Sequence, residues 1–175
     1  SNQLVIAALG QDRPGLVDKL SGWILDSGCN IADSRMMVLG GEFAVLLLVN
    51  GNWNSLAKLE SQLGQTEKQL GMNISVKRTS KKEQRGNLLP YAVDVVALDH
   101  PGSVHNLAGF FSRRSINIHD LSTATYAAAH TGAHMYSVQM TVNVPSSQYV
   151  AQLRDEFYDL CDEMNLDGVI EAVTN

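Results

Sequence analysis

An internal repeat is the feature that most restricts the folds open to this chain. Asp12-Arg13-Pro14-Gly15 recurs as Asp99-His100-Pro101-Gly102, and at the same offset Asn30-Ile31 recurs as Asn117-Ile118. A repeat of this length corresponds to one structural unit that is present twice. The 175 residues are therefore expected to form two small domains of one fold, since each half is long enough for a small domain.

The two copies also share an alternating apolar pattern. Phe43-x-Val45-x-Leu47-x-Val49 corresponds to Tyr136-x-Val138-x-Met140-x-Val142, with a longer preceding loop in the second copy. Between the copies lies a polar, charged segment without periodicity, which is the composition of a linker. We expect a first domain at residues 3–79, a linker at 80–89 and a second domain at 90–175.

Hydrophobic periodicity predicts the same order of elements in both copies. A first strand runs into the repeated Asp-x-Pro-Gly motif, and an amphipathic helix follows it. A hairpin, a second helix and a final strand complete each copy. The strands are expected at residues 4–9, 31–39, 42–49 and 74–77 and at residues 92–98, 118–128, 135–144 and 169–173, with a single second helix near residues 56–70 and 150–164.

This β-α-β-β-α-β order is the split pattern in which two helices cover one face of a four-stranded antiparallel sheet. The fold class is therefore α+β, with two tandem ferredoxin-like domains. The Asp-x-Pro-Gly motif fits the turn from strand to helix. Asp12 is a preferred residue type at a helix N-cap, and Pro14 suits a first helical turn because its missing N–H has no partner to lose.

Charge distribution argues against direct nucleic-acid binding. The formal net charge is −5, and residues 90–175 contain three basic and ten acidic residues. A nucleic-acid-binding domain normally presents a basic patch that displaces counterions from phosphates. The acidic residues 155–163 of the last helix are expected to form a solvated face, or to meet a basic surface on a partner protein.

The chain has the composition of an ordinary folded protein, and we expect it to be cytoplasmic. Its longest strongly apolar stretch, residues 44–49, is far shorter than the roughly 18–20 apolar residues that cross a bilayer, and its start shows no secretory signal. We expect Cys29 and Cys161 to be buried, unpaired residues, because their spacing suits neither a metal site nor a redox motif. Trp23 is expected in the core, whereas Trp53 is a candidate partner contact.

The first turn, Asp12-Arg13-Pro14-Gly15-Leu16, together with Gly28-Cys29-Asn30-Ile31 entering the second strand, resembles the ACT domain family of small-molecule-sensing modules. The resemblance covers nearly the whole chain, in two copies. It implies amino-acid binding between copies, with contacts from the first turn and the second strand. A tandem pair without an attached enzyme or DNA-binding domain resembles regulators that respond to a small amino acid, glycine first, by contacting a DNA-binding transcription regulator.

The chemistry of these residues suits an amino acid. A carboxylate could dock at the unpaired N–H groups of a helix N-terminus where glycine allows close approach, and asparagine carbonyls and nearby aspartates could accept from the ammonium. The alternative is that the motif serves only as a cap and a tight turn. The predicted ligand-binding residues are Asp12, Arg13, Pro14, Gly15, Asn30 and Ile31, and Asp99, His100, Pro101, Gly102, Asn117 and Ile118.

Other classes of function find less support in the sequence. No nucleophile–base pair, phosphate-binding glycine loop or carboxylate pair indicates an enzyme. All five histidines lie in the second copy, but none has the spacing of a helical zinc site, so we expect no metal and no cofactor. Exposed sheet edges favour a homo-oligomer. The alternatives are a ligand-free interaction or dimerisation module and an accessory subunit of an enzyme.

Overall fold

The structure is a computed structural model that describes residues 2–80, 86–98 and 102–174. The chain divides into two compact units, Ser1–Glu83 and Gln84–Asn175. The predicted site residues Asp99, His100 and Pro101, and part of the predicted linker, lie outside the described residues. Within that predicted linker segment, the last strand of the first unit, β4 (Asn73–Ser80), extends to Ser80, and the first strand of the second unit, β5 (Leu88–Leu98), begins at Leu88.

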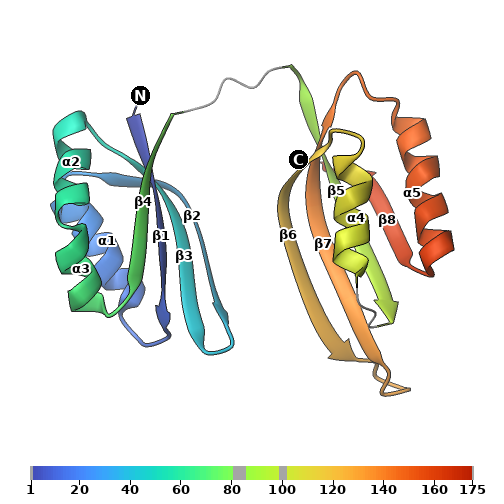
Figure 1. The fold of residues 1–175 in the computed structure, drawn as a ribbon, viewed down its shortest axis with the longest axis horizontal. Helices are drawn as coiled ribbons and strands as arrows, with labels where there is room; N and C mark the ends of the chain where they lie inside the picture. Colours follow the sequence, from blue (N-terminus) through green and yellow to red (C-terminus); the bar gives the residue numbers. More distant parts are fainter. Residues whose placement is uncertain (1, 81–85, 99–101, 175) are drawn as a thin grey trace. The chain divides into compact units, whose positions relative to one another are not determined.

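The first unit is one antiparallel sheet with its helices on one face (Figure 1). The strand order is β2-β3-β1-β4, which leaves β2 and β4 at the edges. This is the predicted ferredoxin-like topology. The elements are β1 (Asn2–Gln11), α1 (Leu16–Asp26), β2 (Asn30–Leu39), β3 (Glu42–Asn50), α2 (Trp53–Ser61), α3 (Leu63–Leu70) and β4 (Asn73–Ser80).

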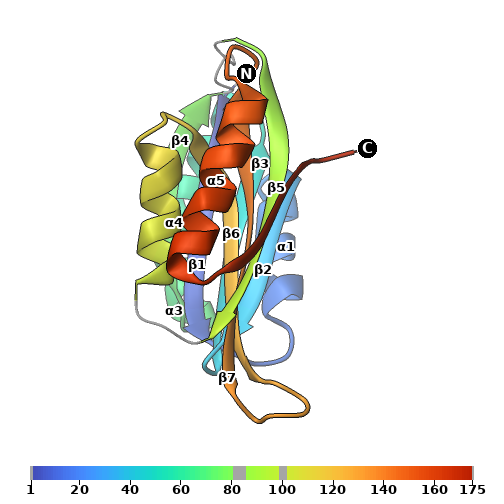
Figure 2. The ribbon, with the colours of Figure 1, turned by 90° about the vertical axis from the view of Figure 1, so that its right-hand side faces the viewer.

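The second unit repeats this topology, with the strand order β6-β7-β5-β8. Figure 2 shows α4 and α5 lying over the same face of the second sheet. The α+β prediction of two tandem domains with antiparallel sheets is thereby confirmed for both units. The elements are β5 (Leu88–Leu98), α4 (Ser103–Ser112), β6 (Asn117–Ala127), β7 (His134–Pro145), α5 (Val150–Met164) and β8 (Asp167–Ala172).

Strand alternation places the core between sheet and helices. On β3, Phe43, Val45, Leu47 and Val49 are buried, whereas Leu46 points to the opposite face and is 51% exposed. The stripe of α1 that meets the sheet consists of Leu16, Leu20 and Ile24. The period-two and period-3.6 patterns in the sequence thus correspond to the two sides of one apolar layer.

Aromatic rings fill the corresponding layer of the second unit. Phe110 and Phe111 pack edge to face, with ring centroids 5.0 Å apart, and both lie near Phe157. The predicted burial of both cysteines is confirmed, since Cys29 and Cys161 are free and buried. No helix in the part of the chain that the structure describes is long and apolar enough to span a membrane.

Two local expectations were wrong. The second helix of the first copy is divided into α2 and α3 at Gln62, which lies at φ −87° and ψ −4°, and the weak helix former Gly64 follows it. Neither Asp12 nor Pro14 belongs to α1. Gly15 is the N-cap instead, because its φ of 90° starts the helix only at Leu16.

Each second strand also contains a β-bulge that periodicity did not predict. The pairing register shifts between Ile31 and Asp33 in β2, and between Ile118 and Asp120 in β6. A bulge inserts one residue without a partner and reverses the face that the following side chains occupy. Since the shift occurs at matching positions of the repeat, it belongs to the shared fold.

We expect Phe157→Ala to lower the free energy of unfolding of the second unit by about 3–5 kcal/mol, because it removes a fully buried ring from the core. Urea unfolding followed by far-UV circular dichroism measures the change. Tyr149→Ala is the control, since that ring is 78% exposed and its removal should change stability by less than about 0.5 kcal/mol. Equal effects of the two substitutions would contradict the assigned core.

Candidate functional site

The conformation of the turn from β1 to α1 depends on the backbone of one glycine, Gly15. Gly15 adopts φ 90° and ψ 0°, a left-handed conformation that strains any residue with a Cβ atom. It caps α1 without a side-chain hydrogen bond, and the first intrahelical bond runs from the Lys19 N–H to the Gly15 carbonyl at 3.0 Å. The N–H groups of residues 16–18, which precede Lys19 in α1, therefore have no acceptor within the helix and point out of its N-terminal end.

A small cleft of about 260 Å³ lies beside this turn. The turn contributes Asp12, Arg13 and Gly15, while Met36 of β2 and Phe43 of β3 contribute apolar walls. Sites for drug-sized ligands are roughly 300–1,000 Å³, so this cleft suits a smaller molecule. Among the predicted site residues, the structure thus brings the three turn residues together around one opening.

Arg13 has a second, structural contact. Its Nη2 donates to the backbone carbonyl of Leu70, at the C-terminal end of α3. Carbonyl groups at this end of a helix carry partial negative charge and lack intrahelical partners, so a guanidinium is a favourable donor there. Arg13, which the sequence analysis predicted to be a ligand contact, therefore links the turn to the C-terminal end of α3.

Asn30 and Ile31 do not join the turn within one copy. β1 and β2 both pair with β3, and Gln11 and Leu39 both lie opposite Glu42, whereas Asn30 lies opposite Asn50. Asn30 is thus about 25–30 Å along the sheet from the turn. Within one copy the Asn30 amide is therefore too far away to contact a ligand at the turn, because α1 returns the chain to the far end of the sheet before β2 begins.

The second copy reproduces this geometry where it is described. Gly102 caps α4 with φ 91°, and the Asn106 N–H donates to its carbonyl at 2.9 Å. Asn117 again lies at the opposite end of the sheet, since it pairs with Asn143 while Leu98, the last residue of β5, pairs with Met135. Ile118, like Ile31, packs against the hydrophobic core of its unit.

The edge strand β2 carries an apolar surface that the sequence analysis did not single out. Met36, Met37, Val38 and Leu39 are between 48% and 70% exposed. At the matching positions the edge strand β6 has Thr123, Ala124 and Thr125, and Tyr126, which is 44% exposed, stands where β2 has Leu39. The sequence does contain a sign of this surface. A sheet with one buried face buries only every second side chain of a strand, so four consecutive apolar residues must leave some apolar side chains exposed.

The cysteines offer no nucleophile to this site. Burial raises the pKa of the Cys29 thiol, and burial together with the nearby carboxylates of Asp162 and Asp167 raises the pKa of Cys161 to about 11. Both thiols therefore stay protonated at neutral pH, whereas a catalytic cysteine needs a lowered pKa and access to solvent.

Comparison with known proteins places the fold of the first unit in a known family. Residues 2–77 match the model of the ACT domain family. Two solved structures share the fold of the whole chain. One, provisionally assigned as a glycine cleavage system transcriptional repressor, is 29% identical, with a TM-score of 0.73 and coverage of 99% of this chain and 98% of that one. The other, an unknown protein from Galdieria sulphuraria, is 26% identical, with a TM-score of 0.79 and coverage of 99% and 100%.

These matches define the class as a tandem ACT-domain protein. The glycine cleavage system transcriptional repressor of Escherichia coli strain K12 is 34% identical over 170 residues, which are 97% of this chain and 90% of that protein. The chain therefore belongs to the family of glycine cleavage system transcriptional repressors.

We expect Arg13→Ala to lower the free energy of unfolding of the first unit by about 1.5–3 kcal/mol, since it leaves the Leu70 carbonyl without its charged donor. Urea unfolding followed by tryptophan fluorescence reports on this unit, because both tryptophans, Trp23 and Trp53, belong to it. Arg35→Ala is the control, as its ion pair with Asp33 is exposed and should contribute little. An Arg13→Ala protein as stable as the control would show that the contact is not a structural tie.

Proposed function

We propose that this chain is a non-catalytic regulator that binds a small amino acid, glycine first, and represses a glycine cleavage operon by contacting a DNA-binding transcription regulator. The observation that carries the proposal is the 34% identity, across 97% of the chain, to the Escherichia coli protein of that name. The acidic second copy supports contact with a protein in place of DNA. Such a role places the chain in the cytoplasm.

The cleft beside Gly15 supports the choice of ligand. A carboxylate fits the outward N–H groups at the start of α1, where the helix dipole is positive and no side chain occupies the cap. The Asp12 carboxylate, which lines the same cleft, suits the ammonium group. The volume of about 260 Å³ favours an amino acid with a small side chain.

Pairing of two chains along β2 would complete this site. If two β2 strands met edge to edge and antiparallel about the middle of the strand, Asn30 of one copy would lie near the Leu39 end of the other, and hence near its Gly15 turn. The exposed apolar residues 36–39 favour such an interface. A homodimer would thus reunite the two halves of the predicted site, which one copy holds apart.

Ligand binding would regulate the partner only if it favours one of two states. A ligand shifts an equilibrium by the difference between its affinities for the two states. An amino acid bound across a β2 interface binds the assembled form and hardly the separate chains. Its concentration would therefore set how much of the chain is in the form that the transcription regulator meets.

Thermal unfolding with glycine, serine and alanine tests the sensor. Ligand that binds only the folded chain stabilises it by about 2.7 kcal/mol at 100 times its dissociation constant, so we expect glycine to raise the unfolding temperature. Asp12→Asn should abolish most of that rise, and Asp159→Asn, on an exposed face of α5, should retain it. No rise with any amino acid, while partner binding persists, would favour a ligand-free interaction module.

A further inference from the structure

The face of the first sheet that lies opposite the helices is apolar at its centre (Figure 1). An antiparallel sheet with one buried face usually presents polar side chains on the other. Here Leu9 of β1 is 50% exposed and Leu46 of β3 is 51% exposed. The strand pairing places both in one patch on the two central strands, which we call the open face. Its central residues are Val5, Ala7, Leu9, Ala44, Leu46 and Leu48.

Polar and charged side chains stand at the rim of the open face. Asp33 and Arg35 lie on the edge strand β2 and form an ion pair at 2.7 Å. Lys77 lies on the other edge strand, β4. The pairing register joins Asp33 to Leu48, Leu48 to Val5 and Val5 to Lys77, so these four residues form one row across the sheet. An apolar centre with a polar rim is the usual anatomy of a protein–protein interface.

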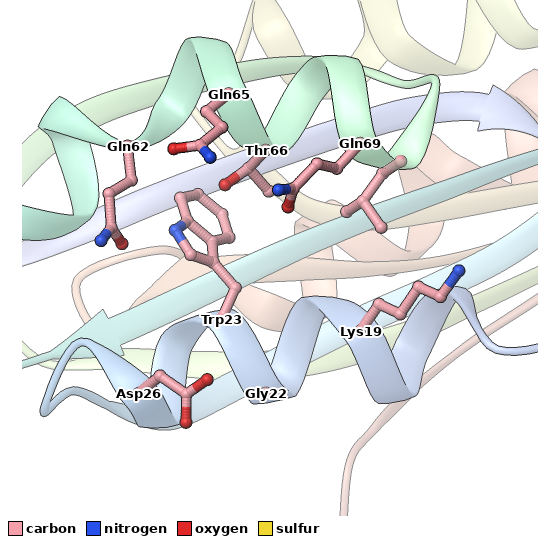
Figure 3. Close-up of a pocket in the computed structure, with 9 residues that line it drawn as sticks. Lys19, Gly22, Trp23, Asp26, Gln62, Gln65, Thr66 and Gln69 are labelled. Carbon is pink, nitrogen blue, oxygen red and sulfur yellow. The ribbon is translucent and has the colours of Figure 1, made fainter.

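A groove in the helical layer of the same unit is polar by comparison. Figure 3 shows this groove between α1 and α3, where Lys19, Asp26 and three glutamines line it. Trp23, which was expected in the core, is partly buried between the two helices and packs against the core. The open face is apolar and lies on the other side of the sheet, so it suits another flat apolar surface.

The matching face of the second sheet is polar at its centre. Asp94 stands where the first sheet has Ala7, and Gln139, its partner in the register, stands where the first sheet has Leu46. Both Asp94 and Gln139 are exposed. Since the two units share one topology, the fold itself does not require an apolar open face. The apolar patch is a property of the first copy, and exposed patches of this kind mark interaction surfaces.

The geometry of the sheet allows the open face to pack against a second copy of itself. Two stacked sheets lie about 10 Å apart, with their strands within about 30° of one another. If a twofold axis runs parallel to the strands through the middle of the interface, β1 of each chain lies over β3 of the other, and β2 lies over β4. Each row of register partners then faces the same row of the other chain in reverse order.

Side-chain sizes on the central strands match in this arrangement. Leu46 of each chain would lie over Ala7 of the other, and Leu9 would lie over Ala44. Each half-exposed leucine therefore faces an alanine, and each contact occurs twice. Large residues that face small ones let two layers interdigitate without voids.

The rim charges match in the same arrangement. Asp33 of each chain would lie over Lys77 of the other, so that two ion pairs flank the apolar centre. A crossing angle of about 30° displaces the rim by a few Å, which the long side chain of lysine can span. In the second unit the same operation would place Asp120 over Glu171. Charge therefore favours self-pairing of the first unit and opposes it in the second.

The area of the open face limits the affinity of such a contact. Strands about 4.8 Å apart, each with about four outward residues some 6.6 Å apart, give this four-stranded sheet a face of roughly 500 Å². Two chains together would bury about 1,000 Å², which is the lower limit for a specific interface. We therefore expect weak association that depends on concentration.

We propose that two chains associate through the open faces of their first units, with Leu46 over Ala7 and Asp33 against Lys77. This contact goes beyond the proposed function, because it needs neither the amino acid nor the transcription regulator. It is also separate from pairing along β2, since it covers side chains on the sheet face and leaves the hydrogen-bonding groups of the β2 edge uncovered.

Sedimentation velocity of the full chain, over a hundredfold range of concentration up to about 1 mM, tests this inference. The Val38→Lys protein is the parent, because Val38 lies opposite Phe43 on the helix side of β2 and a lysine there blocks edge pairing without altering the open face. We expect its sedimentation coefficient to rise with concentration from that of a monomer towards that of a dimer.

Adding Leu46→Lys to this parent should raise the dissociation constant at least tenfold, because it places a charge at the centre of the interface. Leu25→Lys is the matched control. Leu25 is an even more exposed leucine, at 72%, but it lies on α1, so its substitution should leave association unchanged.

Charge reversal tests the arrangement of the two chains. Asp33→Lys and Lys77→Glu, each added to the same parent, should weaken association about tenfold, since each sets like charges against one another twice. A mixture of the two variants should associate as well as the parent, because the new lysine then faces the new glutamate and the unchanged Lys77 faces the unchanged Asp33. Within one chain the two positions are about 14 Å apart, so a contact inside the chain cannot explain such a rescue.

Three results would each overturn the inference. The parent could remain monomeric at every concentration, Leu46→Lys could associate as well as Leu25→Lys, or the mixture of charge variants could associate no better than either variant alone.

Discussion

Each unit buries only one face of its sheet, and most of its other properties follow from this constraint. The helices remove Phe43, Val45, Leu47 and Val49 of β3 from water, while no helix of the unit covers the opposite face of the sheet. Hydrophobic burial on one side is sufficient to order the strands. The remaining surfaces, namely the edges, the turns and the outer side of the helical layer, are thus left to interact with other molecules.

The topology could be predicted from the sequence because its determinants are local and occur twice. Strand alternation and the apolar stripe of α1 (Leu16, Leu20 and Ile24) can each be recognised within a short stretch of sequence. Because the same pattern occurs in both copies, the elements predicted for one copy support those predicted for the other. The start of α1 was misplaced because a glycine at φ 90° overrides the capping preference of Asp12. That conformation depends on the loop as a whole and on no single residue's propensity.

The candidate site was predicted less completely, because its geometry depends on contacts between distant residues. Arg13 reaches Leu70 across 57 positions of sequence, and nothing in the repeated motif distinguishes that contact from a ligand contact. The separation of Asn30 from Gly15, by contrast, follows from the predicted element order, since a helix between two parallel-running strands returns the chain to the starting end of the sheet.

The difference between the edge strands β2 and β6 bears on how far chains that pair through β2, as proposed, could assemble. A tandem protein with an adhesive edge on each copy could pair at both, so that every chain added would offer a new edge to the next and a filament would grow. Here β2 has four consecutive exposed apolar residues, whereas β6 has Thr123, Ala124 and Thr125 at three of the matching positions and the half-exposed Tyr126 at the fourth. If two chains pair through β2, as proposed, that one contact would occupy the apolar edge of both partners, and assembly through the edges would stop at two chains.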